Sequence, residues 1–384
     1  MIRHAGVPRV LMAGGGTGGH LFPGVAVAEA LGRRMPGASV RLAATAKDLA
    51  SPHLAACPLE IVQLGSPKRP AGAVHVPGFG VRMAGALLRS YAFLKDSGPE
   101  IVIGLGGYGS VAPVAAARAR RIPVILLEQN AVPGKATRFL SRLGGLVAAS
   151  FDGVGVRGRV VLTGNPIRER VLRTRRAHAE FGLDPSLPVL AVLGGSLGAR
   201  GLNERFVAAA SALVAATGAP FQVLHATGGD DDPRIAAAYA AAGLRACVRP
   251  FFVEMGAVYG TVDVALCRAG GTTVAELAAV GLPAVFVPYP HHKDDHQARN
   301  AAALVERGAA TLVREASLTP DALALHVAPL LENRSLRRRR SRAMREMGRP
   351  DAADRVVDLI LELTGYAEGS LFPAQAAADK EVGP

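Results

Sequence analysis

The chain has 384 residues, 49% of them hydrophobic, which is more than one hydrophobic core usually supports, so two domains are expected. No long apolar run and no signal-peptide core are found, which argues against a membrane-spanning or exported protein. The three cysteines lack C-x-x-C spacing, which argues against a disulfide framework or a zinc site and suits a reducing cytoplasm. The formal net charge of +13 is compatible with binding to nucleic acid, anionic lipid or a phosphorylated substrate. Arginines scattered over the surface without any such partner would give the same charge.

Short apolar runs alternate with helical stretches along the whole chain. Because the runs are continuously apolar, they predict parallel strands buried on both faces, and hence an α/β protein. The predicted strands span 9–13, 39–44, 60–64, 100–105, 123–128 and 145–150 in the first half, and 188–194, 221–227, 246–250, 262–267, 283–288 and 310–313 in the second.

A strand, a glycine turn and a helix occur in succession twice, as VLMAGGGTGGH at 10–20 and VLAVLGGSLGAR at 189–200. Their place at the first strand of each half predicts two doubly wound domains, with a boundary near 160–171. We therefore expect domains at 1–164 and 165–348. Two more helices are predicted at the end, the second within 349–366, and 367–384 is a low-complexity tail that we expect to be mobile.

The first glycine loop formally satisfies the dinucleotide pattern G-x-G-x-x-G. The second predicted strand offers no acid for a ribose before Asp48, and no Lys-Ser/Thr follows the glycines, so neither a nicotinamide site nor a P-loop is favoured. Bare backbone at a helix start still favours an anion. His20, where that helix begins, is either a general base or a structural imidazole.

Two further glycine turns open helices in the second half. Ser196 and nearby N–H groups suit a phosphate, or form a plain strand-to-helix turn. In CRAGGTTVAELAAVGLPAVFVPYPHHKDDHQARNA, at 267–301, Glu276 lies one turn into its helix, where a carboxylate can accept both hydroxyls of a ribose. A helix-dipole role is the alternative.

The run HHKDDH invites a metal interpretation through His291, His292, Asp294, Asp295 and His296. We do not favour it, because Asp294 or Asp295 serves equally well as a helix N-cap and no second cluster completes a coordination shell. The sequence analysis therefore assigns no metal and no cofactor.

Six motifs in order, GGGTGGHLFPG, GLGGYGSVAP, LEQNAVPGKATR, TGNPIR, GGSLGAR and the long segment at 267–301, resemble the MurG family of glycosyltransferase family 28, within the GT-B superfamily. The resemblance runs from about residue 9 to 365. It implies two Rossmann-like domains facing a cleft, with a C-terminal helix crossing back to the first. It also implies inverting transfer of N-acetylglucosamine from UDP-N-acetylglucosamine to the muramyl 4-hydroxyl of lipid I, giving lipid II and UDP in peptidoglycan synthesis.

The resemblance also implies site residues. The second domain would bind the donor, with Glu276 on the ribose, backbone near Phe252 on the uracil, and Gln297, helped by His296, on the sugar. The other implied donor residues are Thr17, Gly18, Gly19, Asn130, Arg168, Ser196, Gly271, Thr272 and Thr273. One departure is Leu197, where the family usually has glutamine.

On the acceptor side the resemblance implies the first glycine loop, including Gly15 and Gly16, with Tyr108 nearby. His20 is the candidate base that takes the proton of the attacking hydroxyl, and Glu128 is the runner-up. No metal is required, because helix starts and backbone donors can stabilise the departing UDP.

Because lipid I is a membrane lipid, docking on an anionic membrane is expected, at the cytoplasmic face of the bacterial cell membrane. The segment 75–95 combines apolar and basic side chains that suit such a surface, and Lys135, Arg138 and Arg142 lie in a neighbouring segment. An ordinary core-packing helix is the alternative. The expected patch comprises Phe79, Arg82, Leu87, Leu88, Arg89, Tyr91 and Lys95.

Two other functions stay open in the sequence. One is a nucleotide-sugar epimerase of the UDP-N-acetylglucosamine 2-epimerase type, and the other is a non-catalytic nucleotide-sugar-binding scaffold, which the Leu197 departure keeps in view. The expected partners are UDP-N-acetylglucosamine, lipid I, the anionic membrane and proteins of the cell-wall or division machinery, without nucleic acid.

Overall fold

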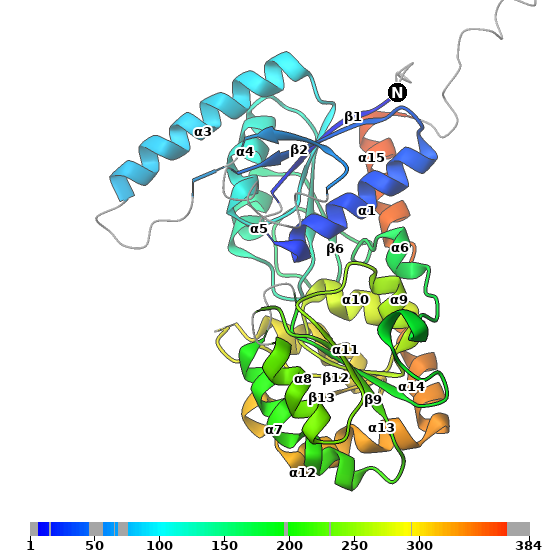
Figure 1. Ribbon diagram of the computed structural model, residues 1–384. Coiled ribbons are helices and arrows are strands. Elements are labelled where there is room, and N and C mark those ends of the chain that lie inside the picture. Colours follow the sequence, from blue (N-terminus) through cyan, green and yellow to red (C-terminus); the bar gives the residue numbers. More distant parts are fainter. Residues whose placement is uncertain are drawn as a thin grey trace, which may run out of the picture. The chain divides into compact units, whose positions relative to one another are not determined.

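The computed structural model of the chain describes residues 7–14, 17–45, 57–64, 66–67, 76–195, 199–229, 232–292 and 294–366. They form two compact units, each built on one parallel sheet flanked by helices (Figure 1). The first unit contains the described residues up to Gln129, then Pro133–Arg168 and the segment from Asp351. The second contains Asn130–Val132 and Glu169–Pro350.

The sheet of the first unit has seven parallel strands in the order β3-β2-β1-β4-β5-β6-β7. Its strands are β1 (Arg9–Ala13), β2 (Ser39–Ala44), β3 (Glu60–Gln63), β4 (Ile101–Gly104), β5 (Val124–Glu128), β6 (Leu146–Ala149) and β7 (Arg159–Leu162). Its α-helices are α1 (Gly18–Arg34), α3 (Val76–Ser97), α4 (Val111–Ala119), α5 (Lys135–Leu140) and α15 (Ala352–Thr364), with 3₁₀ turns η3 (Tyr108–Ser110) and η4 (Ser141–Leu143).

The sheet of the second unit has six parallel strands in the order β10-β9-β8-β11-β12-β13. Its strands are β8 (Val189–Leu193), β9 (Gln222–Ala226), β10 (Ala246–Arg249), β11 (Val264–Cys267), β12 (Ala284–Phe286) and β13 (Ala310–Leu312). Its α-helices are α6 (Glu169–Leu172), α7 (Arg200–Ala216), α8 (Asp232–Ala241), α9 (Met255–Thr261), α10 (Gly271–Val280), α11 (His296–Glu306), α12 (Pro320–His326), α13 (Ala328–Glu332) and α14 (Arg334–Met347), with 3₁₀ turns η5 (His178–Phe181) and η6 (Glu315–Ser317).

Both sheets reverse their strand order at the first strand of the unit. In the first unit β1 lies between β2 and β4, and in the second β8 lies between β9 and β11. Open α/β sheets bind ligands outside the carboxyl ends of the strands at such a switch point. The glycine loops that leave β1, β4, β8 and β11 are therefore where a site is expected.

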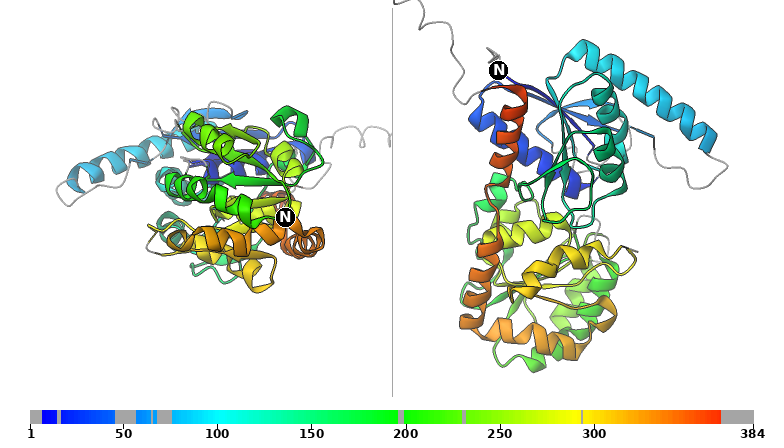
Figure 2. Two further views of the ribbon diagram at one scale, coloured as in Figure 1. Left: turned by 60° about the horizontal axis from the view of Figure 1, so that its bottom comes forward. Right: turned by 180° about the vertical axis from the view of Figure 1, so that it is seen from behind.

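The C-terminal helix α15 packs on α1 of the first unit, and Figure 2 shows the two helices side by side from behind. One face of α15 is buried because Val356, Val357 and Ile360 recur at helical spacing and join the core beneath α1. Arg34 adds an ion pair with Asp358, at 2.8 Å, on the exposed side. The final segment thus belongs to the core of the first unit.

Each predicted strand overlaps an observed one, and the α/β doubly wound prediction is confirmed. The sequence analysis missed β7, whose residues are exposed or half-buried and which is a strand only because it pairs with β6. The unit boundary falls after Arg168 rather than after residue 164, and Asn130–Val132 group with the second unit. None of the described helices has both the length and the hydropathy of a membrane span.

Candidate functional site

The loop that leaves β1 approaches the loop that leaves β4 so closely that only glycine fits. Gly14 has φ +111°, and a Cβ atom there would lie 2.5 Å from the carbonyl oxygen of Gly106. Gly106 itself has φ +94°, and a Cβ atom there would lie 2.9 Å from Cδ2 of His20. The glycines therefore bring two bare loops and an imidazole together at the switch point of the first sheet.

His20 lies in the first turn of α1 and is oriented by the residue that caps this helix. The side-chain oxygen of Thr17 is 3.0 Å from Nδ1 of His20, and the Thr17 carbonyl accepts the His20 N–H. Burial lowers the pKa of His20, and this outweighs the opposing effect of the Glu128 charge. The imidazole is consequently neutral at neutral pH, which is the form that a general base needs.

Glu128 ends β5 and is only 3% exposed. Its Oε2 accepts the N–H of Gly134 at 3.0 Å, which anchors the loop before α5. The neighbouring Gln129 donates from Nε2 to the carbonyl of Leu105, at 3.1 Å, and so holds the loop after β4. The carboxylate thus has a structural partner and acts on His20 through its charge.

Other predicted residues of the first unit lie around the same loops. Tyr108, 37% exposed, opens the turn η3 and contacts the ring of Phe79 edge-on. The guanidinium of Arg168 lies 3.7 Å from the ring centre of Phe22, on α1, and Arg168 is buried. Gly18 and Gly19 form the first turn of α1.

In the second unit the glycine pair before α10 places a helix start at the end of β11. Gly270 is the N-cap, so the N–H groups of Gly271, Thr272 and Thr273 form the first turn, where an anion is favoured. Glu276 follows on the same helix and is 6% exposed. The hydroxyl of Tyr259, on α9, donates to Oε2 of Glu276 at 2.8 Å and fixes the orientation of this carboxylate.

Two loops beside α10 are held by polar side chains, one of which, Arg268, was not predicted from the sequence, whereas the other, Gln297, was. Arg268 is buried, donates from Nη1 to the carbonyls of Val287 and Pro288 at 3.1 and 3.2 Å, and forms an ion pair with Glu315. Gln297, in the first turn of α11, accepts the N–H of Tyr289 at 2.8 Å. Arg268 thereby joins the loop after β11 to the loop after β12, and Gln297 joins the latter to the start of α11.

Asn130 is placed by Asn300, a residue that the sequence analysis also missed. Asn300 is buried on α11, and its Nδ2 donates to Oδ1 of Asn130 at 3.1 Å and to the carbonyl of Ala269 at 3.0 Å. Its Oδ1 accepts the N–H of Ala131 at 2.8 Å. Asn130 therefore sits beside the glycine turn before α10, in the second unit, whereas the sequence analysis assigned it to the first.

Phe252, expected near a uracil, is buried on the loop between β10 and α9. Its ring meets Phe181 edge-on at 5.6 Å between centres, and the guanidinium of Arg249 lies 5.6 Å from both rings. The backbone beside Phe252 is consequently held by packing. Ser196, Gly15, Gly16 and the departure at Leu197 lie outside the described residues.

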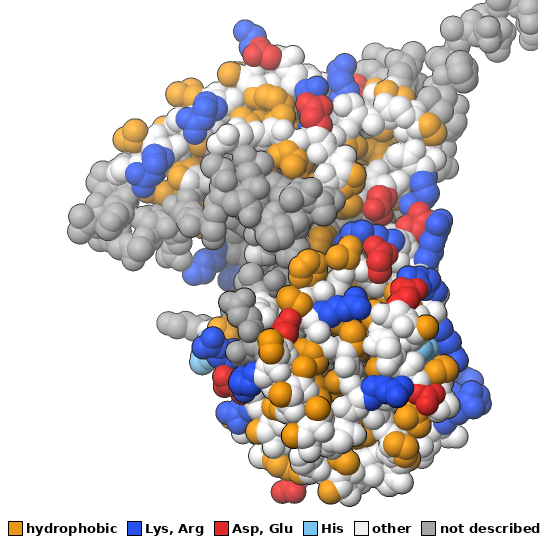
Figure 3. Space-filling model, in the orientation of Figure 1, with side chains coloured by type: hydrophobic (Ala, Val, Ile, Leu, Met, Phe, Trp, Pro, Cys, Tyr) orange, Lys and Arg blue, Asp and Glu red, His pale blue; other side chains and the backbone are white. Residues whose placement is uncertain are grey.

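The helix α3 carries the expected apolar and basic surface. Ala86, Ser90 and Leu94 recur every four residues, are buried and mark the face toward α4, whereas Leu88 is 71% and Tyr91 44% exposed. Figure 3 shows hydrophobic and basic side chains together along this helix. The exposed basic residues are Arg82, Arg89 and Lys95, while Phe79 and Leu87 are half-buried.

A second exposed apolar pair lies on α5 and in the turn η4 that follows it. Phe139 is 48% and Leu143 39% exposed, and the exposed cations Lys135, Arg138 and Arg142 flank them. The sequence analysis noted the cations and missed the two apolar residues. Only the exposure of Phe139 and Leu143 in the structure distinguishes them from core residues.

Comparison with known proteins gives consistent matches over both units. Residues 10–147 match the N-terminal domain of glycosyltransferase family 28, and residues 189–356 match its C-terminal domain. The chain is 37% identical over 376 residues to the UDP-N-acetylglucosamine–N-acetylmuramyl-(pentapeptide) pyrophosphoryl-undecaprenol N-acetylglucosamine transferase of Anaeromyxobacter sp. strain K, a match that covers 95% of each chain.

Solved structures resemble the chain as well. The crystal structure of MurG from Acinetobacter baumannii matches with a TM-score of 0.73 and 32% identity, over 92% of this chain and 99% of that one. A putative UDP-N-acetylglucosamine 2-epimerase from Listeria monocytogenes matches with a TM-score of 0.64 and 13% identity, over 93% of this chain and 96% of that one, a likeness of fold alone.

Proposed function

Because the chain belongs to the MurG family of glycosyltransferase family 28, we propose that it transfers N-acetylglucosamine from UDP-N-acetylglucosamine to lipid I, giving lipid II and UDP. The observation that carries the proposal is the 37% identity over 95% of the chain, with glycine-opened helix starts at the switch points of both sheets. In this reaction the muramyl 4-hydroxyl attacks the anomeric carbon. Its proton passes to a base, and the electron pair of the broken C–O bond leaves with UDP.

The second unit supplies the donor site in this proposal. Glu276, buried and oriented by Tyr259, accepts hydrogen bonds from both ribose hydroxyls. The N–H groups of the first turn of α10 face the diphosphate and stabilise the charge that develops on departing UDP. The backbone beside Phe252 binds the uracil edge, and Gln297 binds the sugar.

The first unit supplies the base and the acceptor side. His20 is the proposed base, because it is neutral, is held by Thr17 and sits on the bare backbone of the β4 loop. Glu128 is proposed to tune His20 rather than replace it, since its Oε2 already accepts a backbone N–H. Tyr108 and the glycine loop after β1 are proposed to contact the acceptor.

A direct assay tests the reaction. The chain is incubated with labelled UDP-N-acetylglucosamine and a lipid I analogue, and release of UDP together with a disaccharide lipid is expected. Release of free N-acetylmannosamine would instead indicate an epimerase. Donor binding without turnover in the chain, unchanged in a His20→Ala variant, would indicate a binding scaffold.

Membrane docking is proposed for the exposed apolar and basic surface of α3, together with the exposed apolar and basic residues of α5 and η4 around Phe139. Its partner is an anionic lipid surface, because exposed Leu88 and Tyr91 are interspersed with Arg82, Arg89 and Lys95. The Leu88→Glu variant is expected to bind anionic vesicles about tenfold more weakly or worse, since burying a leucine contributes about 1.5–3 kcal/mol.

Leu325 is a matched control for this experiment. It is 68% exposed on α12 of the second unit, close to the 71% of Leu88, so a Leu325→Glu variant makes the same change elsewhere. Vesicle sedimentation should separate the two variants. Equal vesicle binding by both would refute the α3 surface as the docking site.

A further inference from the structure

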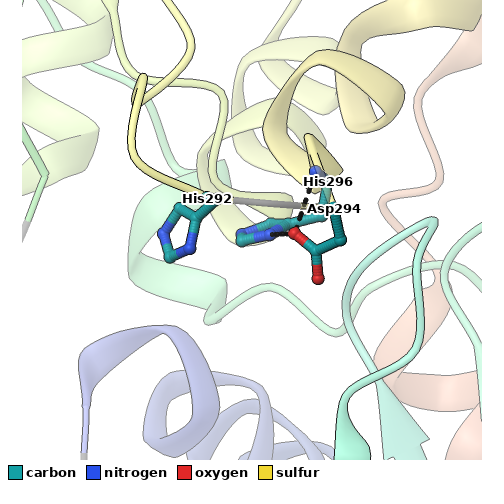
Figure 4. A group of neighbouring side chains, drawn as sticks. All are labelled: His292, Asp294 and His296. Atoms are coloured by element: carbon teal, nitrogen blue, oxygen red, sulfur yellow. Dashed lines mark hydrogen bonds and ion pairs between the residues drawn. The ribbon is translucent and has the colours of Figure 1, made fainter.

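The loop between β12 and α11 gathers three metal-ligating side chains. His292, Asp294 and His296 each offer one ligand atom, and these atoms lie within 4.8 Å of one another (Figure 4). The imidazole rings of His292 and His296 are 4.3 Å apart between centres. Oδ1 of Asp294 is 2.9 Å from Nδ1 of His296. Lys293, between two of them in sequence, lies outside the described residues.

The backbone around the cluster is fixed by contacts that the cluster does not itself make. Asp295 has φ +48°, a left-handed conformation that is unusual for a non-glycine residue, and its N–H donates to the carbonyl of His292 at 3.1 Å. Both carboxylate oxygens of Asp295 accept hydrogen bonds from Arg314, at 2.7 and 2.6 Å. The turn that brings His292 back toward His296 is therefore held by Arg314, which lies just after β13.

The far end of the loop is fastened as well. The ring of Tyr289 meets His292 edge-on, at 4.9 Å between centres, while Gln297 accepts the Tyr289 N–H at 2.8 Å. The loop is thus tied to α11 at both ends.

The two aspartates before α11 differ in what their carboxylates bind. Asp295 is the N-cap residue of α11 but makes no side-chain cap bond, because its carboxylate is engaged by Arg314. Asp294, by contrast, contacts both the imidazole and the backbone of His296, because its Oδ1 is 2.9 Å from Nδ1 and accepts the His296 N–H at 3.5 Å.

We propose that His292, Asp294 and His296 form a binding site for a divalent transition-metal ion of the Zn²⁺ or Co²⁺ class. Two imidazoles and one carboxylate suit these ions, whereas Mg²⁺ and Ca²⁺ prefer sites made of oxygen alone. A tetrahedral ion with bonds of about 2.0–2.1 Å needs ligand atoms about 3.4 Å apart. The three ligand atoms already lie within 4.8 Å of one another, so binding requires these partly exposed side chains to rotate. Three protein ligands leave a position open to water.

The position of the cluster gives the site a consequence that rests on the proposed function. His296 immediately precedes Gln297, which we propose binds the donor sugar. An ion on His296 withdraws that imidazole from the sugar and fixes the loop. Zn²⁺ is therefore expected to inhibit turnover of the wild-type chain and to inhibit a His292→Ala variant much less.

Direct binding of Co²⁺ to the full chain, produced without a polyhistidine tag, tests the site independently of catalysis. Titration is followed by visible absorption, which is specific for coordinated cobalt, and by calorimetry with Zn²⁺. One ion per chain is expected. The His292→Ala variant should lose the band, and the Asp294→Asn variant should bind more weakly than the wild type, because it loses the one anionic ligand of the site.

The matched control is His291→Ala, because His291 is the exposed neighbour in sequence and lies outside the cluster. Its cobalt affinity should equal that of the wild type, with circular dichroism showing that every variant is folded. Binding that survives His292→Ala, or that falls equally in His291→Ala, would overturn the proposal. Because no nucleotide is present, neither outcome depends on whether the transferase assay succeeds.

Discussion

Replacing Glu276 by glutamine removes the charge from the carboxylate that we propose grips the ribose, while keeping its size and one acceptor oxygen. In the structure Tyr259 already donates to Oε2 of Glu276 at 2.8 Å, so the side chain is oriented before the nucleotide arrives. A hydrogen bond to a charged group contributes about 1.5–3 kcal/mol. Loss of one such bond should weaken UDP binding about 10- to 150-fold.

The assay is calorimetric titration of UDP and of its 2′,3′-dideoxy analogue against the wild type and the Glu276→Gln variant. If Glu276 meets the ribose hydroxyls, the wild type should prefer UDP strongly, and the variant should have lost most of that preference. A Tyr259→Phe variant should show a smaller loss, because it keeps the charge and loses only its orientation. Equal discrimination between the two ligands by the wild type and Glu276→Gln would refute the ribose assignment.

Three further predictions follow from His20, His225 and the glycine loop. In a plot of kcat/KM against pH, the midpoint of the acid limb should lie at a lower pH than the pKa of an ordinary histidine, because burial lowers the pKa of His20. The Glu128→Gln variant should shift this midpoint to a still lower pH, because it removes the charge that raises the pKa of His20. Burial lowers the pKa of His225 to about 4, so the unfolded chain binds the extra proton, and the free energy of unfolding of the second unit should fall by about 2 kcal/mol from pH about 7 to about 5. Urea unfolding should show this loss in the wild type and a flatter profile in His225→Gln. Gly14→Ala should destabilise the first unit by about 3 kcal/mol, because Gly14 has φ +111° and a Cβ atom there would lie 2.5 Å from a carbonyl oxygen. Gly32→Ala, in open space on α1, should be neutral or stabilising in the same thermal melt. Equal effects of the two substitutions would contradict the steric argument.

The sequence predicted the structure correctly where a feature depends on residues that are close together in the chain. Continuous apolar runs predicted the parallel strands, because a strand covered on both faces needs apolar side chains on both. The glycine pairs marked the turns after β1, β8 and β11 for a similar reason, since each must let backbone pass close to its surroundings. Glu276 could be singled out because it follows such a turn by one helical turn.

The sequence did not predict features in which a residue is positioned by a partner far away along the chain. The strand β7 exists only through its pairing with β6, and the orientation of Glu276 depends on Tyr259, on another helix. Asn130 joins the second unit through Asn300, 170 residues away. The spacing of residues within a short segment cannot predict such long-range pairs.

The amino-acid sequence by itself determined that this chain folds as two doubly wound sheets with bare loops at their switch points, because burial and backbone sterics act within a few residues. Only the tertiary structure decided which side chains those loops hold together. It showed that Asp295 pairs with Arg314 instead of capping α11, and that His292 is turned back toward His296. The physical reason is that side-chain partners are chosen by proximity in space, which the packing of whole elements sets.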